Sequence, residues 1–234
     1  MSGHSKWATT KRAKEAKDSK RSSLFTKLSK NITIAARDGQ DPDANFKLRM
    51  AVDKAKALSM PKDNIERAIK RGGGTGEGDN IESLVYEAYG PEGVAIILEV
   101  LTDNKNRTVG NLKHVLSKAG GNLGSSGSVL WMFEMKGQII LKNSSLSEEE
   151  ELKIIESGAE DIVRDEQIQV LTNKEDLALV RENLAKSNFE IEDSDIIYLA
   201  KDKVSVSDEE KLLRLLDALD DDDDVNNIYT NADI

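Results

Sequence analysis

A run of glycines divides this chain into two parts with different hydrophobic periods. Five of the seven residues from Gly72 to Gly78 are glycine. Before the run, apolar residues recur at three- and four-residue spacing, which is typical of amphipathic helices. After it, β-rich stretches alternate with helical ones. The run lacks the Lys-Ser/Thr pair of a phosphate-binding loop and follows a helix rather than a strand, so we interpret residues 73–79 as a linker between domains.

Residues 1–72 are predicted to form a small domain of helices. Three apolar stripes at helical spacing support this prediction, and they cover residues 24–35, 44–58 and 65–69. Asp41 followed by Pro42 is predicted to begin the second helix, because aspartate is a good N-cap and proline suits the first helical position. Ahead of the first stripe, Trp7 is the only large apolar side chain after Met1, so residues 1–21 are either a mobile arm or a helix held by Trp7.

Charge is divided unevenly along the chain. The net charge is −10, yet residues 1–72 carry 18 Lys and Arg against 8 Asp and Glu, which gives +10. The other 162 residues carry 15 against 35, which gives −20. A basic domain on an acidic body suggests salt-dependent binding to phosphates. The alternative is a solvated basic helical surface that has no partner.

The part after the linker is predicted to contain two α+β units. Strands are expected at 84–89, 94–101, 129–135, 138–141, 167–172, 196–200 and 225–229, and helices at 109–119, 148–157, 174–187 and 208–219. The first unit lacks a closing helix and strand, and the chain ends with such a pair. We therefore expect residues 80–136 and 205–234 to form one α+β domain of the split βαβ, ferredoxin-like kind, with residues 137–204 as an inserted acidic α+β domain.

Residues suited to catalysis or to metal binding are scarce. The chain has no cysteine and only two histidines, His4 and His114, which lie far apart in the sequence. We therefore predict no enzyme activity, no metal site and no cofactor. The acidic runs Glu148–Glu151 and Asp220–Asp224 lack the spacing of a calcium loop and are interpreted as solvated helix ends. No apolar run approaches a membrane span and the first residues lack the apolar core of a signal peptide, so we expect a soluble, cytoplasmic protein without membrane contacts.

Two loops have both a structural and a binding interpretation. Overlapping Gly-x-x-Gly tetrads at Gly121–Gly127 resemble a backbone-clamping loop, but no Lys or Arg lies within them, so a turn is favoured. In Thr102–Thr108, Asn106 or Thr108 is a candidate helix cap and Asp103 a candidate turn-ordering residue. The alternative is that the Asn and Arg groups of this loop meet phosphate or a base edge.

Several blocks of the sequence resemble the YebC/PmpR family. The blocks are Ser2-Gly3-His4-Ser5-Lys6-Trp7-Ala8, Phe25-Thr26-Lys27-Leu28, Met60 to Gly72, Tyr89-Gly90-Pro91, Gly93-Val94-Ala95, Leu101 to Thr108, Gly120-Gly121-Asn122-Leu123 and Gly127-Ser128-Val129. They are collinear from residue 2 to about residue 133. The chain departs from the family pattern at Phe46-Lys47, Ala88 and Thr9-Thr10. Residues after 133 match the family in their pattern of residue types more than in residue identity.

The resemblance implies three domains, one helical and two α+β, with the third inserted into the second. It also implies a DNA-binding transcriptional regulator, since the family is usually described in those terms. A mitochondrial branch activates translation, and bacterial members are linked to stalled ribosomes. We hold DNA and the ribosome as equal alternatives, and an enzyme or a protein–protein adaptor as less favoured classes.

The expected partner is nucleic acid, either DNA or ribosomal or transfer RNA, bound by a monomer or a weak oligomer. Trp7 is expected either to stack on a base or to pack on the helices. The candidate nucleic-acid-binding residues are Lys6, Trp7, Lys11, Arg12, Lys14, Lys17, Lys20, Arg21, Lys27, Lys30, Lys62, Asn64, Arg67, Lys70, Arg71, Asn104, Asn106 and Arg107.

Overall fold

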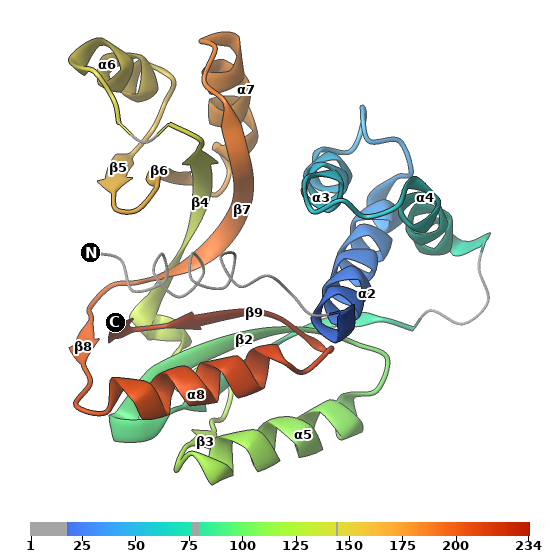
Figure 1. Ribbon diagram of the computed structural model, residues 1–234, viewed down its shortest axis with the longest axis vertical. Coiled ribbons are helices and arrows are strands. Elements are labelled where there is room, and N and C mark those ends of the chain that lie inside the picture. The colour runs from blue at the N-terminus through green and yellow to red at the C-terminus, as the bar shows by residue number, and fades with distance from the viewer. Residues whose placement is uncertain (1–17, 76–79, 144) are drawn as a thin grey trace. The chain divides into compact units, whose positions relative to one another are not determined.

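The computed structural model describes residues 18–75, 80–143 and 145–234, which form helices and mainly antiparallel sheets (Figure 1). The described chain divides into two compact units. The larger unit holds the described residues up to Trp131 together with Val206–Thr230, and the smaller unit holds Met132–Ser205 and Asn231–Ile234. The predicted α+β class, with an N-terminal helical region, is confirmed.

Helices at the start of the larger unit pack around their own apolar core. They are α2 (Asp18–Ala35), the 3-10 turn η1 (Ala36–Asp38), α3 (Phe46–Ala57), α4 (Lys62–Lys70) and the π-type turn η2 (Arg71–Thr75). The predicted stripes supply this core, in which Ile32 and Leu48 are fully buried. The predicted start of the second helix at Asp41-Pro42 was wrong. The cap is Asn45, whose side chain accepts from the Leu48 amide at 3.1 Å.

The same unit contains a four-stranded antiparallel sheet in the order β3-β1-β2-β9. Its strands are β1 (Glu82–Tyr89), β2 (Ala95–Thr102), β3 (Asn122–Leu123) and β9 (Val225–Thr230), and η3 (Pro91–Gly93) joins β1 to β2. Central β2 is buried along nearly its whole length, as its run of Ile, Leu and Val requires. β9 comes from the end of the chain and pairs with β2, so that Ile96 lies opposite Thr230.

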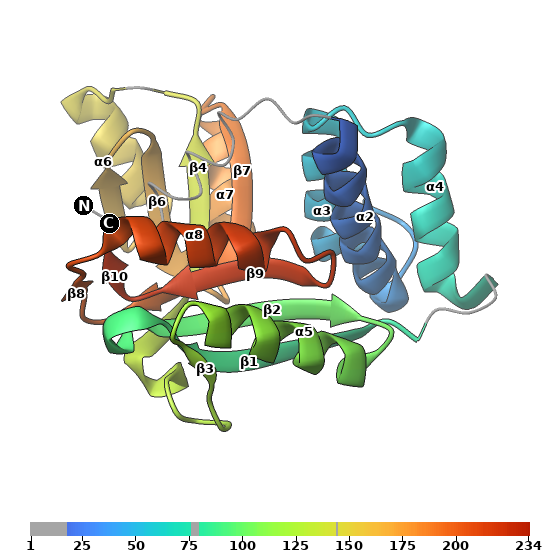
Figure 2. The same cartoon turned by 60° about the horizontal axis from the view of Figure 1, so that its bottom comes forward.

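Two helices lie side by side on one face of this sheet (Figure 2). They are α5 (Lys105–Lys118) and α8 (Glu209–Asp220). Both follow the amphipathic rule, since Leu112 and Leu116 of α5 and Leu212 and Leu216 of α8 are almost fully buried. The turn after α8 and the loop before α5 are thereby brought to the same end of β2.

The smaller unit is a second antiparallel sheet in the order β5-β6-β4-β7, with two helices. Its elements are β4 (Phe133–Leu141), α6 (Glu148–Glu156), β5 (Asp161–Arg164), β6 (Ile168–Asn173), α7 (Leu177–Lys186), β7 (Ile191–Ala200) and the short parallel pair β8 (Val204–Ser205) and β10 (Ala232–Asp233). The predicted strands 129–135 and 138–141 were wrong as separate elements. After the 3-10 turn η4 (Leu130–Met132), a single strand β4 continues through the Gly137 position.

Candidate nucleic-acid interface

The candidate binding residues are spread over three places in the larger unit and over a part of the chain that is not described. Lys6, Trp7, Lys11, Arg12, Lys14 and Lys17 lie outside the described residues, as does the side chain of Lys20. Arg21 is exposed on α2, with its guanidinium 5.3 Å from the centre of the Phe25 ring. The remaining candidates lie on α2, on α4 and at the start of α5.

On α2, the two candidate lysines contact the acidic turn, which we define as Asp220–Asp224. The Lys27 ammonium lies 3.1 Å from the Asp220 carboxylate, and its side chain is 10% exposed. The Lys30 ammonium lies 2.7 Å from the Asp224 carboxylate and also donates to the Asp223 carbonyl at 2.8 Å. Both lysines therefore neutralise carboxylates of the chain itself in this structure.

Asp224 is the centre of this network and is only 4% exposed. Its Oδ1 accepts from Lys30 at 2.7 Å. Its Oδ2 accepts from Arg107 at 2.8 Å, from Thr108 at 2.7 Å and from Thr102 at 3.1 Å. The interpretation of Asp220–Asp224 as a solvated helix end was wrong for Asp224, because this carboxylate is enclosed by donors from β2, α5 and α2.

The pKa of Asp224 reflects this environment. Burial by itself raises the pKa, because it disfavours the charged carboxylate. The hydrogen bonds that Lys30, Arg107 and Thr108 donate outweigh burial and lower the pKa to about 2. Asp224 is therefore ionised at neutral pH and pairs with one cation from α2, Lys30, and one from α5, Arg107.

The loop before α5 is ordered by its own side chains. The side-chain oxygen of Asn104 caps the helix by accepting from the backbone amide of Arg107 at 3.1 Å, and the backbone amide of Asn104 donates to the Thr102 hydroxyl at 2.9 Å. The expectation of a cap at Asn106 or Thr108 was wrong. Arg107 pairs with Asp103 at 2.8 Å in addition to Asp224, whereas Asn104 and Asn106 are exposed.

Helix α4 and the residue after it carry four exposed cations. Lys62, Arg67, Lys70 and Arg71 are all exposed. Lys62 lies 3.6 Å from Glu66, and the Arg67 guanidinium hydrogen-bonds the side-chain oxygen of half-buried Asn64. Such surface pairs are weak, because solvent screens them. We call these four cations the α4 edge; their side chains are exposed to solvent, so an external anion can reach them.

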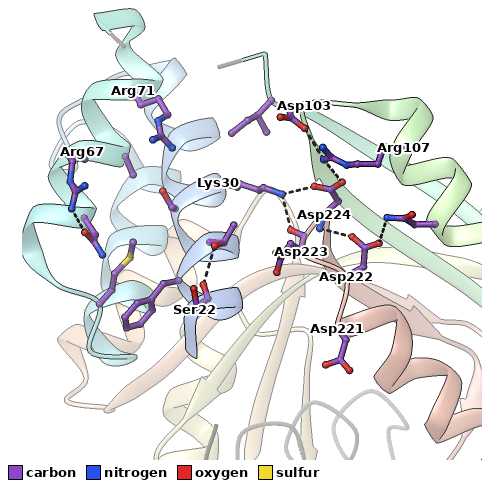
Figure 3. Close-up of a pocket in the computed structure, with 18 residues that line it drawn as sticks. Ser22, Lys30, Arg67, Arg71, Asp103, Arg107, Asp221, Asp222, Asp223 and Asp224 are labelled. Atoms are coloured by element: carbon purple, nitrogen blue, oxygen red, sulfur yellow. Dashed lines mark hydrogen bonds and ion pairs between the residues drawn. The ribbon is translucent and has the colours of Figure 1, made fainter. Parts of the chain in front are cut away.

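A groove of about 890 Å³ separates α4 from the acidic turn (Figure 3). Arg67 and Arg71 line one side, and Asp103, Arg107 and residues 221–224 of the acidic turn line the other, with Lys30 reaching between them. Lysine, arginine and aspartate therefore share the lining, and its positive side is the α4 side. A phosphate backbone would be attracted to that side and repelled from the opposite one.

The glycine-rich loop after α5 is ordered by hydrogen bonds to the side chain of Glu87. The buried Glu87 carboxylate accepts from the backbone amides of Gly127 at 2.5 Å, Val129 at 2.7 Å and Leu130 at 2.8 Å. Burial raises the pKa of Glu87, but these backbone hydrogen bonds outweigh it, so the pKa lies below its usual value. This contact accounts for the loop as an ordered turn, as the lack of Lys and Arg in it suggested.

Family models for the TACO1/YebC proteins match nearly all of this chain. The model of the N-terminal domain matches residues 5–75, and the model of the second and third domains matches residues 81–232. The chain belongs to the TACO1/YebC family. The resemblance seen in the sequence blocks is thereby confirmed.

Members of the TACO1/YebC family with high identity to this chain carry one common description. A protein from Persephonella marina is 48% identical to it, in an alignment that covers all of this chain and 96% of the relative. A protein from Fervidobacterium nodosum is 50% identical, in an alignment that covers all of this chain and 94% of the relative. Each is called "Probable transcriptional regulatory protein". The crystal structure of a conserved hypothetical protein from Aquifex aeolicus is 44% identical, with a TM-score of 0.85 over 94% of both chains.

Sequence reasoning did not place the acidic turn beside the α2 lysines, and it missed Ser23, Asn31 and Asn111 as further contacts of the segment from Asp220 to Asn226. The side chains of Ser23 and Asn31 face the same way as Lys27, and Asn111 on α5 donates to Asp222 at 3.2 Å. A usable signal was present, because five consecutive aspartates between a helix and a strand are more than a helix end needs.

No group of His, Asp and Glu in the described residues is arranged to hold a metal ion, and no described helix is long and apolar enough to cross a membrane.

Proposed function

We propose that this protein is a non-enzymatic regulator of gene expression that acts by binding nucleic acid. The observation that carries the proposal is the charge of residues 1–72, +10 against −20 for the rest of the chain, together with the exposed cations at the α4 edge. Arginine and lysine on one face of a helix bind phosphates, whose condensed counterions are released on binding. The described relatives, each called a "Probable transcriptional regulatory protein", are named in line with this role.

The proposal assigns parts of the chain to roles. Residues 1–72 act as the nucleic-acid-binding domain and residues 73–79 as its linker. The α+β part of the larger unit forms the domain that carries it, and the smaller unit, which begins with β4, forms an acidic insertion. The protein acts in the cytoplasm as a monomer or a weak oligomer.

Structured RNA, including the ribosome, is the second candidate target beside duplex DNA. The acidic remainder of the chain favours it, because a body of charge −20 is repelled along a long uniform duplex. Folded RNA is recognised through its shape and backbone, which a basic domain can contact locally.

A binding experiment with paired variants tests the proposal. We would titrate fluorescent duplex DNA and a folded RNA of similar length with wild type and with Arg67→Gln/Arg71→Gln, between about 50 and 200 mM salt. The variant is expected to bind more weakly. The slope of its plot of log K against log salt should be smaller in magnitude by about 1.5 to 2, because about two phosphate contacts are lost. Wild type that binds neither nucleic acid, or binds without salt dependence, would refute the proposal.

Lys47→Gln/Lys56→Gln is the matched control, because both lysines are exposed on α3 and the change in net charge is the same. If the control weakens binding as much as the α4 variant, only net charge matters and the α4 edge is not the site. The ratio of wild-type affinities for DNA and RNA decides between the two targets.

A further inference from the structure

The polar face of α2, which we define as Ser23, Lys27, Lys30 and Asn31, is covered by the chain itself. Lys27 and Lys30 meet the acidic turn as described above. Ser23 donates to the Asp223 carboxylate, and Asn31 donates to the side-chain oxygen of Asn226 at 2.5 Å. The contacts therefore extend along this face of the helix through two turns.

All these hydrogen bonds run in one direction. The polar face of α2 supplies an ammonium, a hydroxyl or an amide N–H in each, and the segment from Asp220 to Asn226 supplies only oxygen acceptors. Three of the acceptors are carboxylate oxygens, of Asp220, Asp223 and Asp224, and the others are the backbone carbonyls of Asp220 and Asp223 and the side-chain oxygen of Asn226. Lysine, serine and asparagine that donate to a row of anionic oxygens are the usual means by which proteins hold a phosphate backbone.

We propose that the acidic turn imitates a nucleic-acid backbone and keeps the polar face of α2 closed until nucleic acid displaces it. The inference rests on the proposed function and adds its regulation. In the closed state nucleic acid meets the α4 edge without contacts from Lys27 and Lys30. In the open state Lys27 and Lys30 exchange the carboxylates for phosphates.

The geometry makes this exchange feasible. The side chains of Lys27 and Asp220 are 10% and 20% exposed, so both ions are already largely desolvated in the closed state. The desolvation of such a pair offsets much of its attraction, and a phosphate that replaces the carboxylate leaves no unpaired buried charge on Lys27. Asp224 also accepts from Arg107 and Thr108, so it keeps two donors from α5 when Lys30 leaves.

A reversible cross-link tests whether the closed state limits binding. The chain has no cysteine, so Ser23→Cys/Asp223→Cys creates the only two thiols, which a short cleavable bis-thiol reagent can join. The joined protein is expected to bind nucleic acid at least tenfold more weakly than the same protein after cleavage of the link. Equal affinity in the two states would overturn the proposal. Glu82→Cys/Lys105→Cys, which replaces an exposed ion pair at 2.6 Å, is the control link and is expected to leave affinity unchanged.

Neutralising the turn gives an independent test. Asp220→Asn/Asp223→Asn is expected to bind several-fold more tightly than Asp217→Asn/Glu209→Gln, which makes the same charge change on the exposed surface of α8. It should also increase the magnitude of the slope of the plot of log K against log salt by about one, because Lys27 loses its carboxylate partner and becomes available for a phosphate contact, whereas Lys30 stays paired with Asp224. Thermal unfolding monitored by circular dichroism checks that both variants are folded.

The outcomes separate the two proposals. If wild type binds no nucleic acid with salt dependence, the proposed function fails. If wild type binds and the turn variant equals its control in affinity and in salt slope, the proposed function stands and the closing role of the acidic turn is refuted.

Discussion

Asp224→Asn removes the charge at the centre of the network and should destabilise the larger unit. The wild-type carboxylate accepts from four side chains, two of which are cations. An asparagine keeps one acceptor oxygen and directs its amide hydrogens at these donors. The polar groups left without an acceptor then cost free energy.

The pKa supplies the magnitude. A pKa of about 2, against an ordinary value of 3.8, means that the folded protein favours the ionised form by about 2 to 3 kcal/mol at pH 7. Because the folded pKa is depressed, this stabilisation is present above pH 3.8 and is lost as the pH falls toward 2. It should have dropped to about half at pH 3.

Urea unfolding of wild type and variant from pH 7 to pH 3 measures the effect. We expect Asp224→Asn to lose about 2 to 4 kcal/mol at pH 7, with a difference from wild type that shrinks toward pH 3. Asp223→Asn, at an exposed position of the same turn, should change stability by less than about 0.5 kcal/mol. A loss below about 1 kcal/mol at pH 7, or one that does not vary with pH, would refute the reasoning.

Three further substitutions probe the larger unit, each measured by urea unfolding. Glu87→Gln should cost about 1 to 3 kcal/mol and speed hydrogen exchange of the Gly127 amide, since an amide cannot replace the carboxylate as acceptor for three backbone donors. Gly72→Ala should cost about 1 to 3 kcal/mol, because its Cβ would lie 2.2 Å from the Thr33 carbonyl oxygen. Gly110→Ala should instead stabilise by about 0.5 to 1 kcal/mol, because it lies within α5 with no atom near the new Cβ; a loss there would contradict this.

The fold class and most helices could be predicted from the sequence because they depend on local periodicity. The stripe of Leu28 and Ile32 specifies the buried side of α2 whatever that helix packs against. Helix boundaries that depend on tertiary contacts could not be predicted as well from the sequence. Asn45 rather than Asp41 caps α3, because its amide group also donates to the Ala35 carbonyl at 2.7 Å, a contact with another helix.

The sequence identified the basic residues of the candidate site but not the residues that they contact in the fold. Charge counting found Lys27 and Lys30 as members of a basic domain. It could not show that Asp220 and Asp224, nearly two hundred residues later, contact the same helix. They do so because the strand that follows them, β9, pairs with β2. Long-range pairing of this kind leaves no periodic signal, whereas the local ion pair of Arg107 with Asp103 could be read from its four-residue spacing.

Sedimentation of the protein in a cell extract, with and without nucleases, tests most directly whether it binds nucleic acid through its basic helices. Wild type is predicted to travel with large nucleic-acid-containing particles and to return to the top of the gradient after ribonuclease or deoxyribonuclease. The enzyme that releases it identifies the target. Lys62→Glu/Arg67→Glu/Lys70→Glu/Arg71→Glu should stay at the top. Wild type that remains at the top throughout, or a variant that sediments like wild type, would contradict the account.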